Sequence, residues 1–324
     1  MPTRYVIGVD IGGTKLLGGV LDPEFGVHQR VQRTTAGKDT ATLLETMSEA
    51  VGELIDSVDG EVAAVGFGVP SMMDHRSGAC AWSIHLPLAG VPVRSVMAER
   101  LGIPVFVDND GNAAMLAEHR AGAARGARQA VMLTVGTGIG GGLILDGQLY
   151  RGSVGAGAEL GHMVIDLNGP RCQGACPNYG CLEVLASGTA LVREATALAR
   201  ARPSSRLGRL LASGGSLPGA LITELAHDGD PVAGAALELI ATRLGVGVAN
   251  YVNIFNPELV VIGGGVIAAG EMLLGPVRTQ ILERCLPPAR DVAAVLGARF
   301  GAEAGMVGAA VLALDGLDMM KYQR

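Results

Sequence analysis

Apolar and polar positions form blocks along the chain, and two of these blocks have the same layout. Residues 6–22 (VIGVDIGGTKLLGGVLD) consist of an apolar run, a glycine-rich segment and a second apolar run, and residues 130–146 (AVMLTVGTGIGGGLILD) repeat this order. The matched positions are Asp10 and Thr134, Gly12 and Gly136, Gly18 and Gly142, and Asp22 and Asp146. Each block predicts a β-hairpin, and the repeat predicts two related α/β domains that each open with one.

The remaining pattern predicts helices where apolar residues recur three and four positions apart, and strands where short apolar runs end in glycine or polar residues. Helices are expected at 40–56, 113–123 and 305–317, with more of them between the second hairpin and about residue 252. Strands are expected at 62–69, 105–107 and 259–262. We expect a small N-terminal domain at 1–118, with a C-terminal helix of about 305–324 packing back onto it, and a large domain at 119–304.

Composition narrows the class of protein. Among 324 residues, 49% are hydrophobic and 17% are charged, which is typical of a compact globular chain rather than a disordered one. The net charge of -6 provides no basic footprint for DNA or RNA. The longest uncharged stretch, 129–145, is glycine-rich and shorter than a membrane span, and the first residues lack the apolar core of a signal peptide. We therefore expect a soluble, cytoplasmic protein that binds neither nucleic acid nor membrane.

Both glycine-rich turns are candidate phosphate sites, because backbone N–H groups approach phosphate oxygens closely where no Cβ intervenes. The candidate residues are Asp10, Gly12, Gly13, Thr14 and Lys15 in the first turn and Thr134, Gly136, Thr137 and Gly138 in the second. Asp10 would hold a magnesium ion, and Lys15 would meet the transferred phosphoryl group. Two tight turns without a ligand remain the alternative, with Asp10 then a solvated turn residue, but the matched register favours one triphosphate bridging two domains.

Two further groups of residues carry chemistry. Asp110 follows a short apolar strand, where open α/β sheets place their ligands, and a carboxylate there can accept a proton during phosphoryl transfer. Helix capping by Asp108 and Asp110 is the alternative that spacing leaves open. Three cysteines, Cys172, Cys176 and Cys181, lie within ten positions, which in a cytosolic chain indicates a metal before a disulfide.

Six segments in order resemble motifs of the ROK family (repressors, open reading frames and kinases), within the actin-like, hexokinase and heat-shock-protein ATPase superfamily. They are DIGGTK (10–15), GFGVPS (66–71), DNDGN (108–112), TVGTGIGGG (134–142), AELGHM (158–163) with CLE (181–183), and PELVVIGGGV (257–266). The resemblance covers nearly the whole chain. It implies two actin-like (ribonuclease H-like) domains with a cleft between them, and a dimer or tetramer.

The resemblance also implies roles for single residues. Asp110 would be the general base. The sugar would be bound by Ser71, Asn109, Asp110, Glu159, His162 and Glu183, and the adenosine side of ATP by Gly264 and Gly265. A structural zinc ion would be held by His162, Cys172, Cys176 and Cys181. One ring nitrogen of His162 would ligate the zinc while the other meets the sugar.

This chain departs from the family pattern in three places. CxxxC stands where the family usually has CxC, Ser71 stands where it usually has glycine, and His85 where it usually has asparagine. The first departure concerns the zinc-binding loop that the resemblance implies at residues 162–183, called the metal loop below, and the other two concern the rim of the sugar site. They leave the chemistry intact and weaken the assignment of glucose itself as the sugar.

The sequence thus predicts an ATP- and magnesium-dependent hexose kinase, glucokinase-like, acting on a 6-hydroxyl. N-acetylmannosamine kinase, N-acetylglucosamine kinase and fructokinase use nearly the same motifs and stay open. A sugar-sensing ROK transcriptional regulator is the alternative of another class, but its DNA-binding domain would precede the first hairpin, and we expect the first strand already at about Arg4. A sugar-binding protein without turnover is disfavoured by Asp10, Asp110 and both turns.

Overall fold

The computed structural model describes residues 4–83 and 86–322, so His85 lies outside the described residues. Contacts within the chain group it into two units, and each is described by itself. Unit 1 comprises residues 1–126, 142–158 and 302–324. Unit 2 comprises residues 127–141 and 159–301.

Unit 1 is built on a five-stranded sheet with the order β3-β2-β1-β4-β7. Its strands are β1 (Arg4–Ile11), β2 (Lys15–Leu21), β3 (Val27–Thr34), β4 (Glu61–Val69) and β7 (Val105–Asn109). Strand β1 pairs antiparallel with β2, which confirms the first predicted hairpin, and parallel with β4, which in turn pairs parallel with β7. Strand β3 was not predicted, because VHQRVQRT has too few apolar residues to show a buried face.

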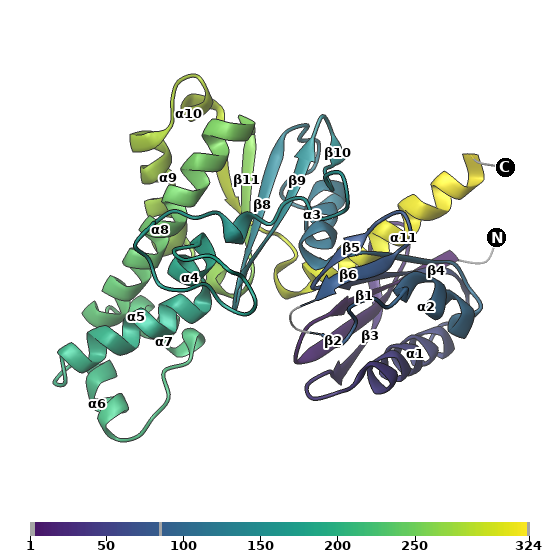
Figure 1. Cartoon of the computed structure of the whole chain (residues 1–324), viewed down its shortest axis with the longest axis horizontal. Helices are drawn as coiled ribbons and strands as arrows, with labels where there is room; N and C mark the ends of the chain where they lie inside the picture. The colour runs from purple at the N-terminus through teal and green to yellow at the C-terminus, as the bar shows by residue number, and fades with distance from the viewer. Residues whose placement is uncertain (1–3, 84–85, 323–324) are drawn as a thin grey trace. The chain divides into compact units, whose positions relative to one another are not determined.

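Helices cover both faces of this sheet (Figure 1). The helices are α1 (Thr40–Asp56), α2 (Val93–Leu101), α3 (Asp110–Ala121) and α11 (Ala304–Tyr322). A Cβ on Gly18 would contact Leu54 of α1, whereas a Cβ on Gly66 would lie 1.7 Å from the Ala309 oxygen of α11. Helix α1 therefore packs on one face, and α11 lies against the other, close enough that only glycine fits beneath it. A separate hairpin consists of β5 (Ser71–Asp74) and β6 (Ala79–Ser83).

The second five-stranded sheet has the order β10-β9-β8-β11-β12. Its strands are β8 (Ala130–Val135), β9 (Ile139–Leu145), β10 (Gln148–Leu149), β11 (Leu259–Gly263) and β12 (Ala294–Gly297). Strand β11 pairs parallel with both β8 and β12. As in the first sheet, an antiparallel edge follows a glycine turn and parallel strands form the other edge, which agrees with two related halves.

Unit 2 is rich in helices. They are the 3₁₀ helices η1 (Leu160–His162) and η2 (Gly265–Ala269), and α4 (Leu182–Ala186), α5 (Gly188–Ala201), α6 (Arg206–Ala212), α7 (Gly219–His227), α8 (Pro231–Phe255), α9 (Glu271–Arg284) and α10 (Ala289–Val292). A third 3₁₀ helix, η3 (Gly301–Glu303), precedes α11. By length and composition α8 could cross a membrane, but 61% of its apolar window is buried in this structure. Since α4, α5, α7 and α9 all pack against it, α8 is the core helix of this unit.

Candidate active site and metal centre

The first part of the site lies in unit 1, where parallel strands end side by side. Asp10 on β1 is the cross-strand partner of Gly68 on β4, which in turn is the partner of Asp108 on β7. Asp110 follows as the first residue of α3. A Cβ on Gly68 would lie 3.7 Å from Asp10 Oδ1 and 3.6 Å from Asp110 Cα. The glycine thus leaves space between the two aspartates at the carboxyl edge of the sheet.

This arrangement changes the acidity of Asp10. Burial, together with the nearby negative charge of Asp110, raises the pKa of the half-buried Asp10 to about 7, although the positive charge of Lys15 opposes this. On its other side Asp10 faces the start of α11, where a Cβ on Gly305 would lie 2.4 Å from its Cγ. Two neighbouring carboxylates favour a shared proton or a cation. Oxygen ligands of this kind fit magnesium.

Asn109 and Ser71 lie beside this carboxylate pair. Asn109 is the N-cap of α3, since its Oδ1 accepts hydrogen bonds from the Gly111 and Asn112 N–H groups at 2.8 and 3.2 Å. Its Nδ2 donates to the Ser71 carbonyl oxygen at 3.3 Å, which leaves one N–H for a ligand. The Ser71 hydroxyl is buried beside the Cys80 thiol, a weak hydrogen-bond partner. The roles of Asn109 and Ser71 in sugar binding stay predictions.

Asp108 has a structural role that its position in the sequence did not reveal. It is 3% exposed at its side chain, and its Oδ2 accepts a hydrogen bond from Arg151 Nε at 2.6 Å. Its Oδ1 accepts from the Asn109 N–H and from Asn112 Nδ2. Asp108 is therefore an anchor of the strand–helix junction rather than a helix cap. Arg151 carries no motif and lies 43 residues away in sequence, so sequence reasoning missed it.

The first glycine turn, between β1 and β2, is held by the end of β3. The Gly12 N–H donates to the Lys15 oxygen at 2.7 Å, which closes the turn. The Thr35 hydroxyl donates to the Gly12 oxygen at 2.6 Å, and the Thr35 N–H donates to the Thr14 oxygen at 3.0 Å. Gly13, Thr14 and Lys15 are exposed. The turn is thus fixed by its carbonyl groups while its tip stays accessible to a ligand.

The second glycine turn, between β8 and β9, borders a cavity of about 710 Å³ in unit 2. The lining residues are Gly136, Thr137, Gly188, Thr189, Leu191, Val192, Gly219, Ala220, Thr223, Glu224, His227, Gly265, Val266 and Ala268. Gly136, Thr137 and Gly265 were candidates from sequence, whereas Thr134, Gly138 and Gly264 are not in this lining. Gly264 has φ +82°, and a Cβ there would lie 2.4 Å from the Val135 oxygen, so the backbone requires glycine at this position for structural reasons.

Helices α5 and α7 supply most of the apolar wall of this cavity, through side chains such as Leu191, Val192 and Ala220. No sequence signal set them apart, because apolar residues at helical spacing also describe a core face. The volume is within the usual range for a small-molecule site. Of its lining residues only Glu224 and His227 are titratable.

The other predicted sugar residues occupy neighbouring segments of unit 2. Glu159 is exposed and directly precedes η1, and His162 ends η1 and is half-buried. Glu183 lies in the first turn of α4, and its Oε2 accepts a hydrogen bond from the Ile139 N–H at 2.8 Å. The structure thus connects Glu183 to the second glycine turn, which its predicted role did not include.

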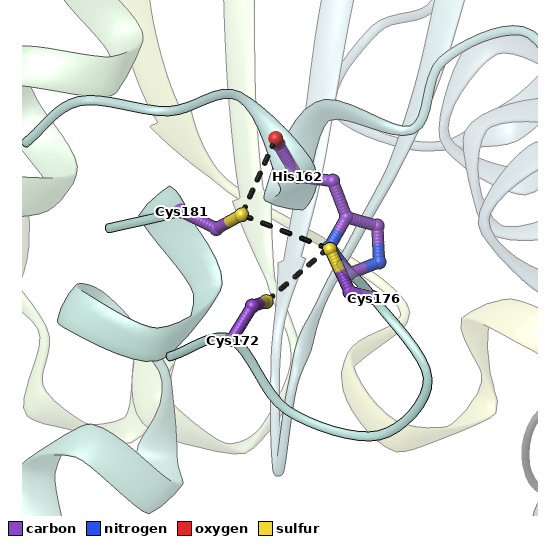
Figure 2. A group of neighbouring side chains, drawn as sticks. All are labelled: His162, Cys172, Cys176 and Cys181. Atoms are coloured by element: carbon purple, nitrogen blue, oxygen red, sulfur yellow. Dashed lines mark hydrogen bonds between the residues drawn. The ribbon is translucent and has the colours of Figure 1, made fainter. Parts of the chain in front are cut away.

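The predicted metal ligands converge. One ligand atom from each of His162, Cys172, Cys176 and Cys181 lies within 4.8 Å of every other (Figure 2). His162 Nδ1 lies 3.6 Å from Cys172 Sγ, and the sulfurs of Cys176 and Cys181 are 3.9 Å apart. The two inserted residues of CxxxC therefore do not prevent a four-ligand cluster. In Figure 2 the second ring nitrogen of His162 faces away from the cysteines.

The chemistry of this cluster fits a cation. Burial raises the pKa of the Cys172 thiol, and Cys181 and Cys176 add to this rise. Burial also raises the pKa of the Cys181 thiol, where a hydrogen bond with Cys172 opposes the rise and Cys176 adds to it. Three thiolates this close would repel one another without a cation, whereas zinc is commonly held by three cysteines and one histidine. The cluster is therefore a candidate zinc site.

Comparison with known proteins defines the class. The model of the ROK family matches residues 6–316, and the chain belongs to this family. It is 37% identical to a glucokinase of Thermotoga maritima, over 96% of this chain and 97% of that protein. The fold class predicted from the sequence is confirmed by this match and by the solved structures.

Two solved structures bear on function. A ROK family glucokinase from Streptomyces griseus, in complex with glucose and AMPPNP, is 35% identical with a TM-score of 0.86, and the match covers 96% of this chain and 100% of that one. A ROK family transcriptional regulator is 28% identical with a TM-score of 0.89, and the match covers 98% of this chain and 81% of that one. The fold is therefore shared by a kinase and a regulator, so the fold alone does not separate the two functions.

Proposed function

We propose that this ROK family protein is an ATP-dependent hexose kinase that transfers the γ-phosphoryl group to the 6-hydroxyl of a hexose, glucokinase-like. The observation that carries the proposal is the carboxylate pair of Asp10 and Asp110 at the ends of parallel strands. A regulator that only binds sugar does not require a carboxylate beside a phosphate turn. The similarity to glucokinases along nearly the full chain supports the same reading.

In this proposal each aspartate has its own task. Asp110 accepts the proton of the attacking hydroxyl, because phosphoryl transfer needs a positioned base more than covalent chemistry. Asp10 holds magnesium, which when bound would neutralise charge on the phosphates. Lys15, exposed at the start of β2, adds a positive charge for the transferred group. Asp108 and Arg151 keep the strand–helix junction fixed, so the base has a defined position.

The nucleotide is assigned to the cavity of unit 2. Its apolar wall suits a base, and the second glycine turn at its edge offers backbone N–H groups to phosphates. Gly265 borders the cavity, and Gly264, the residue before it, packs against the backbone of Val135. The first turn would take the terminal phosphates, with Gly12, Gly13 and Thr14.

The sugar residues proposed are Ser71, Asn109, Asp110, Glu159, His162 and Glu183. Carboxylate, amide and imidazole groups form the paired hydrogen bonds that sugar hydroxyls require. Glucose is the first candidate. N-acetylmannosamine, N-acetylglucosamine and fructose remain alternatives, because Ser71 and His85 differ from the pattern at the rim.

The zinc ion is proposed as structural. His162, Cys172, Cys176 and Cys181 would hold it through Nδ1 and three sulfurs, and zinc would fix the tautomer and orientation of the His162 ring. The Nε2 atom would then be free to meet a sugar hydroxyl. We also propose a cytoplasmic homo-oligomer, a dimer or tetramer, that binds neither nucleic acid nor membrane.

An ADP-release assay across glucose, fructose and acetamido hexoses tests the function. We expect sugar-dependent ADP release with one preferred sugar. Asp110→Asn keeps the shape and removes the base, so turnover should fall by about 10²- to 10⁴-fold. Asp59→Asn, at an exposed aspartate of the same unit, is the matched control and should be unchanged. Full turnover in Asp110→Asn, or no ADP release with any sugar, would sink the proposal.

A further inference from the structure

The second glycine turn is held on several sides by the segment that follows the metal centre. The Gly136 oxygen accepts a hydrogen bond from the Gly188 N–H at 2.8 Å, and the Thr137 oxygen accepts one from the Thr189 hydroxyl at 2.8 Å. The Ile139 N–H, just past the turn, donates to Glu183 Oε2 at 2.8 Å. The conformation of the turn therefore depends on α4 and the start of α5.

Glu183 approaches the turn so closely that a side chain is excluded there. A Cβ on Gly138 would lie 2.3 Å from Glu183 Oε2. The carboxylate thus fills the space beside the turn and accepts the backbone N–H at its exit. Within the described residues no hydrogen bond involves the other carboxylate oxygen, Oε1, which remains available to a substrate hydroxyl.

Two segments that carry metal ligands lie next to Ile139. Cys181 is the N-cap residue of α4, two positions before Glu183. From the other direction, a Cβ on Gly161 would lie 2.1 Å from the Ile139 oxygen, and His162 follows Gly161 directly. The segments of the two ligands are joined by a bridge between Val164 and Cys181. Ile139 is therefore contacted by two short segments, Gly161–His162 and Cys181–Glu183, and each segment contains a ligand of the cluster shown in Figure 2.

A third connection runs from the metal loop to α5. Gln173, adjacent to Cys172, donates through Nε2 to the Ser187 hydroxyl oxygen at 3.3 Å. Ser187 is fully buried and is the N-cap of α5, where it accepts a hydrogen bond from the Ala190 N–H. The next two residues, Gly188 and Thr189, are those that bind the turn. The metal loop thus supports the same helix start that holds the turn.

We propose that Glu183 is a positioning residue for the phosphoryl donor: it holds the second glycine turn in the form that binds phosphate, and the Cys₃His cluster acts on donor binding through it. This rests on the proposed kinase function. The role predicted for Glu183 was sugar binding alone, and that of the metal was to orient the His162 ring. Here the same carboxylate serves both substrates, with Oε2 on the turn and Oε1 left for the sugar.

The size of the expected loss in nucleotide affinity follows from the hydrogen bond between the Ile139 N–H and Glu183 Oε2. A hydrogen bond from a backbone N–H to an ionised carboxylate is stronger than a neutral one, and its loss leaves the N–H at the exit of the turn without its partner. We expect Glu183→Ala to weaken nucleotide binding by about tenfold or more. Glu183→Gln retains an acceptor oxygen and should stay within about threefold of the wild type.

The test measures AMPPNP binding to the full-length, metal-loaded chain by calorimetry without sugar, together with hydrogen exchange of the Ile139 amide. In Glu183→Ala we expect weaker binding and faster exchange, both restored in Glu183→Gln. The matched control is Glu238→Ala, an exposed glutamate on α8 of the same unit. Unchanged AMPPNP affinity in Glu183→Ala, with sugar affinity lost, would overturn the inference. Failure of the wild type to bind AMPPNP would instead refute the kinase function itself.

Metal removal gives an independent arm that does not depend on the Ala variant folding. Chelation of the wild type should weaken AMPPNP binding about as much as Glu183→Ala does, and should speed exchange at Ile139. In Glu183→Ala, chelation should add little, because the connection is already broken. If the chelated wild type binds AMPPNP as tightly as the loaded protein while circular dichroism shows it folded, the metal does not act on the donor turn and the inference is wrong.

Discussion

Asp10→Asn is expected to make the protein more stable at pH 8 while removing activity. Burial and the charge of Asp110 raise the pKa of Asp10 to about 7 in the folded chain, from an ordinary value of 3.8. The folded state therefore binds the Asp10 proton more tightly than the unfolded state does. The stability contributed by this group is fully present below pH 3.8, declines as the pH rises, and is lost above about pH 7.

The magnitude follows from the same two values. The interval between 3.8 and about 7 corresponds to at most about 4 kcal/mol. Asp10 is only half-buried and Lys15 offsets part of the repulsion, so we expect Asp10→Asn to gain about 1–3 kcal/mol at pH 8. For a chain of this size that is a rise in Tm of several degrees. Near pH 4 the variant and the wild type should be equally stable, because both side chains are then mostly neutral.

The assay is thermal and urea unfolding at pH 4, 6 and 8, in EDTA so that no divalent cation binds the carboxylates. Asp59→Asn removes an exposed aspartate of the same unit and should show no pH-dependent gain. Added magnesium should reduce the difference at pH 8, because the cation relieves the repulsion in the wild type. If Asp10→Asn is less stable than the wild type at pH 8, or if its gain is the same at all three pH values, the reasoning fails.

Three further outcomes are expected. About one zinc ion per chain should copurify, and it should be lost in Cys176→Ser and kept in Cys80→Ser; metal-free protein in elemental analysis would contradict this. Because burial raises the pKa of Cys172 and Cys181, the affinity for zinc should fall as the pH falls. Gly180→Ala (φ +64°, Cβ 1.7 Å from the Asp166 oxygen) should cost at least about 2 kcal/mol more than Gly37→Ala (φ +71°, open space) in urea unfolding, and equal costs would refute the crowding argument. ATP hydrolysis should be far slower without the preferred sugar than turnover with it, and equal rates would show that the two sites are not coupled.

The sequence was most informative where a backbone geometry allows few residue types. Both glycine turns were predicted in register, because each needs backbone without Cβ between two apolar strands, and both hairpins are present. The three cysteines were predicted from type and spacing and His162 from the resemblance to the ROK family, and the four side chains converge despite the longer CxxxC. Helix α3 begins three residues before its predicted start, because Asn109 rather than a later residue caps it.

Contacts between distant segments were beyond the reach of pattern reasoning. Nothing in the sequence connects Glu183 with Ile139 or Asp108 with Arg151, since each pair lies more than 40 residues apart and consists of common residue types. The cavity wall was missed for a related reason. Leu191 and Val192 have the spacing of any core helix, and only the fold shows that they border an opening.

Helix α11 makes the order of synthesis matter for this protein. This helix packs onto strands β1 and β4 and onto α3, all of which precede it by far in the chain and are synthesised long before it. The packing is too close for any side chain at two glycines of this contact, because a Cβ on Gly308 would lie 1.6 Å from the Ala113 oxygen and one on Gly66 would lie 1.7 Å from the Ala309 oxygen. The N-terminal sheet therefore has one apolar face uncovered until α11 has been synthesised. Nascent chains stalled before residue 304 should be chaperone clients, and a stop codon just ahead of α11 would damage the sheet of unit 1, which is synthesised much earlier.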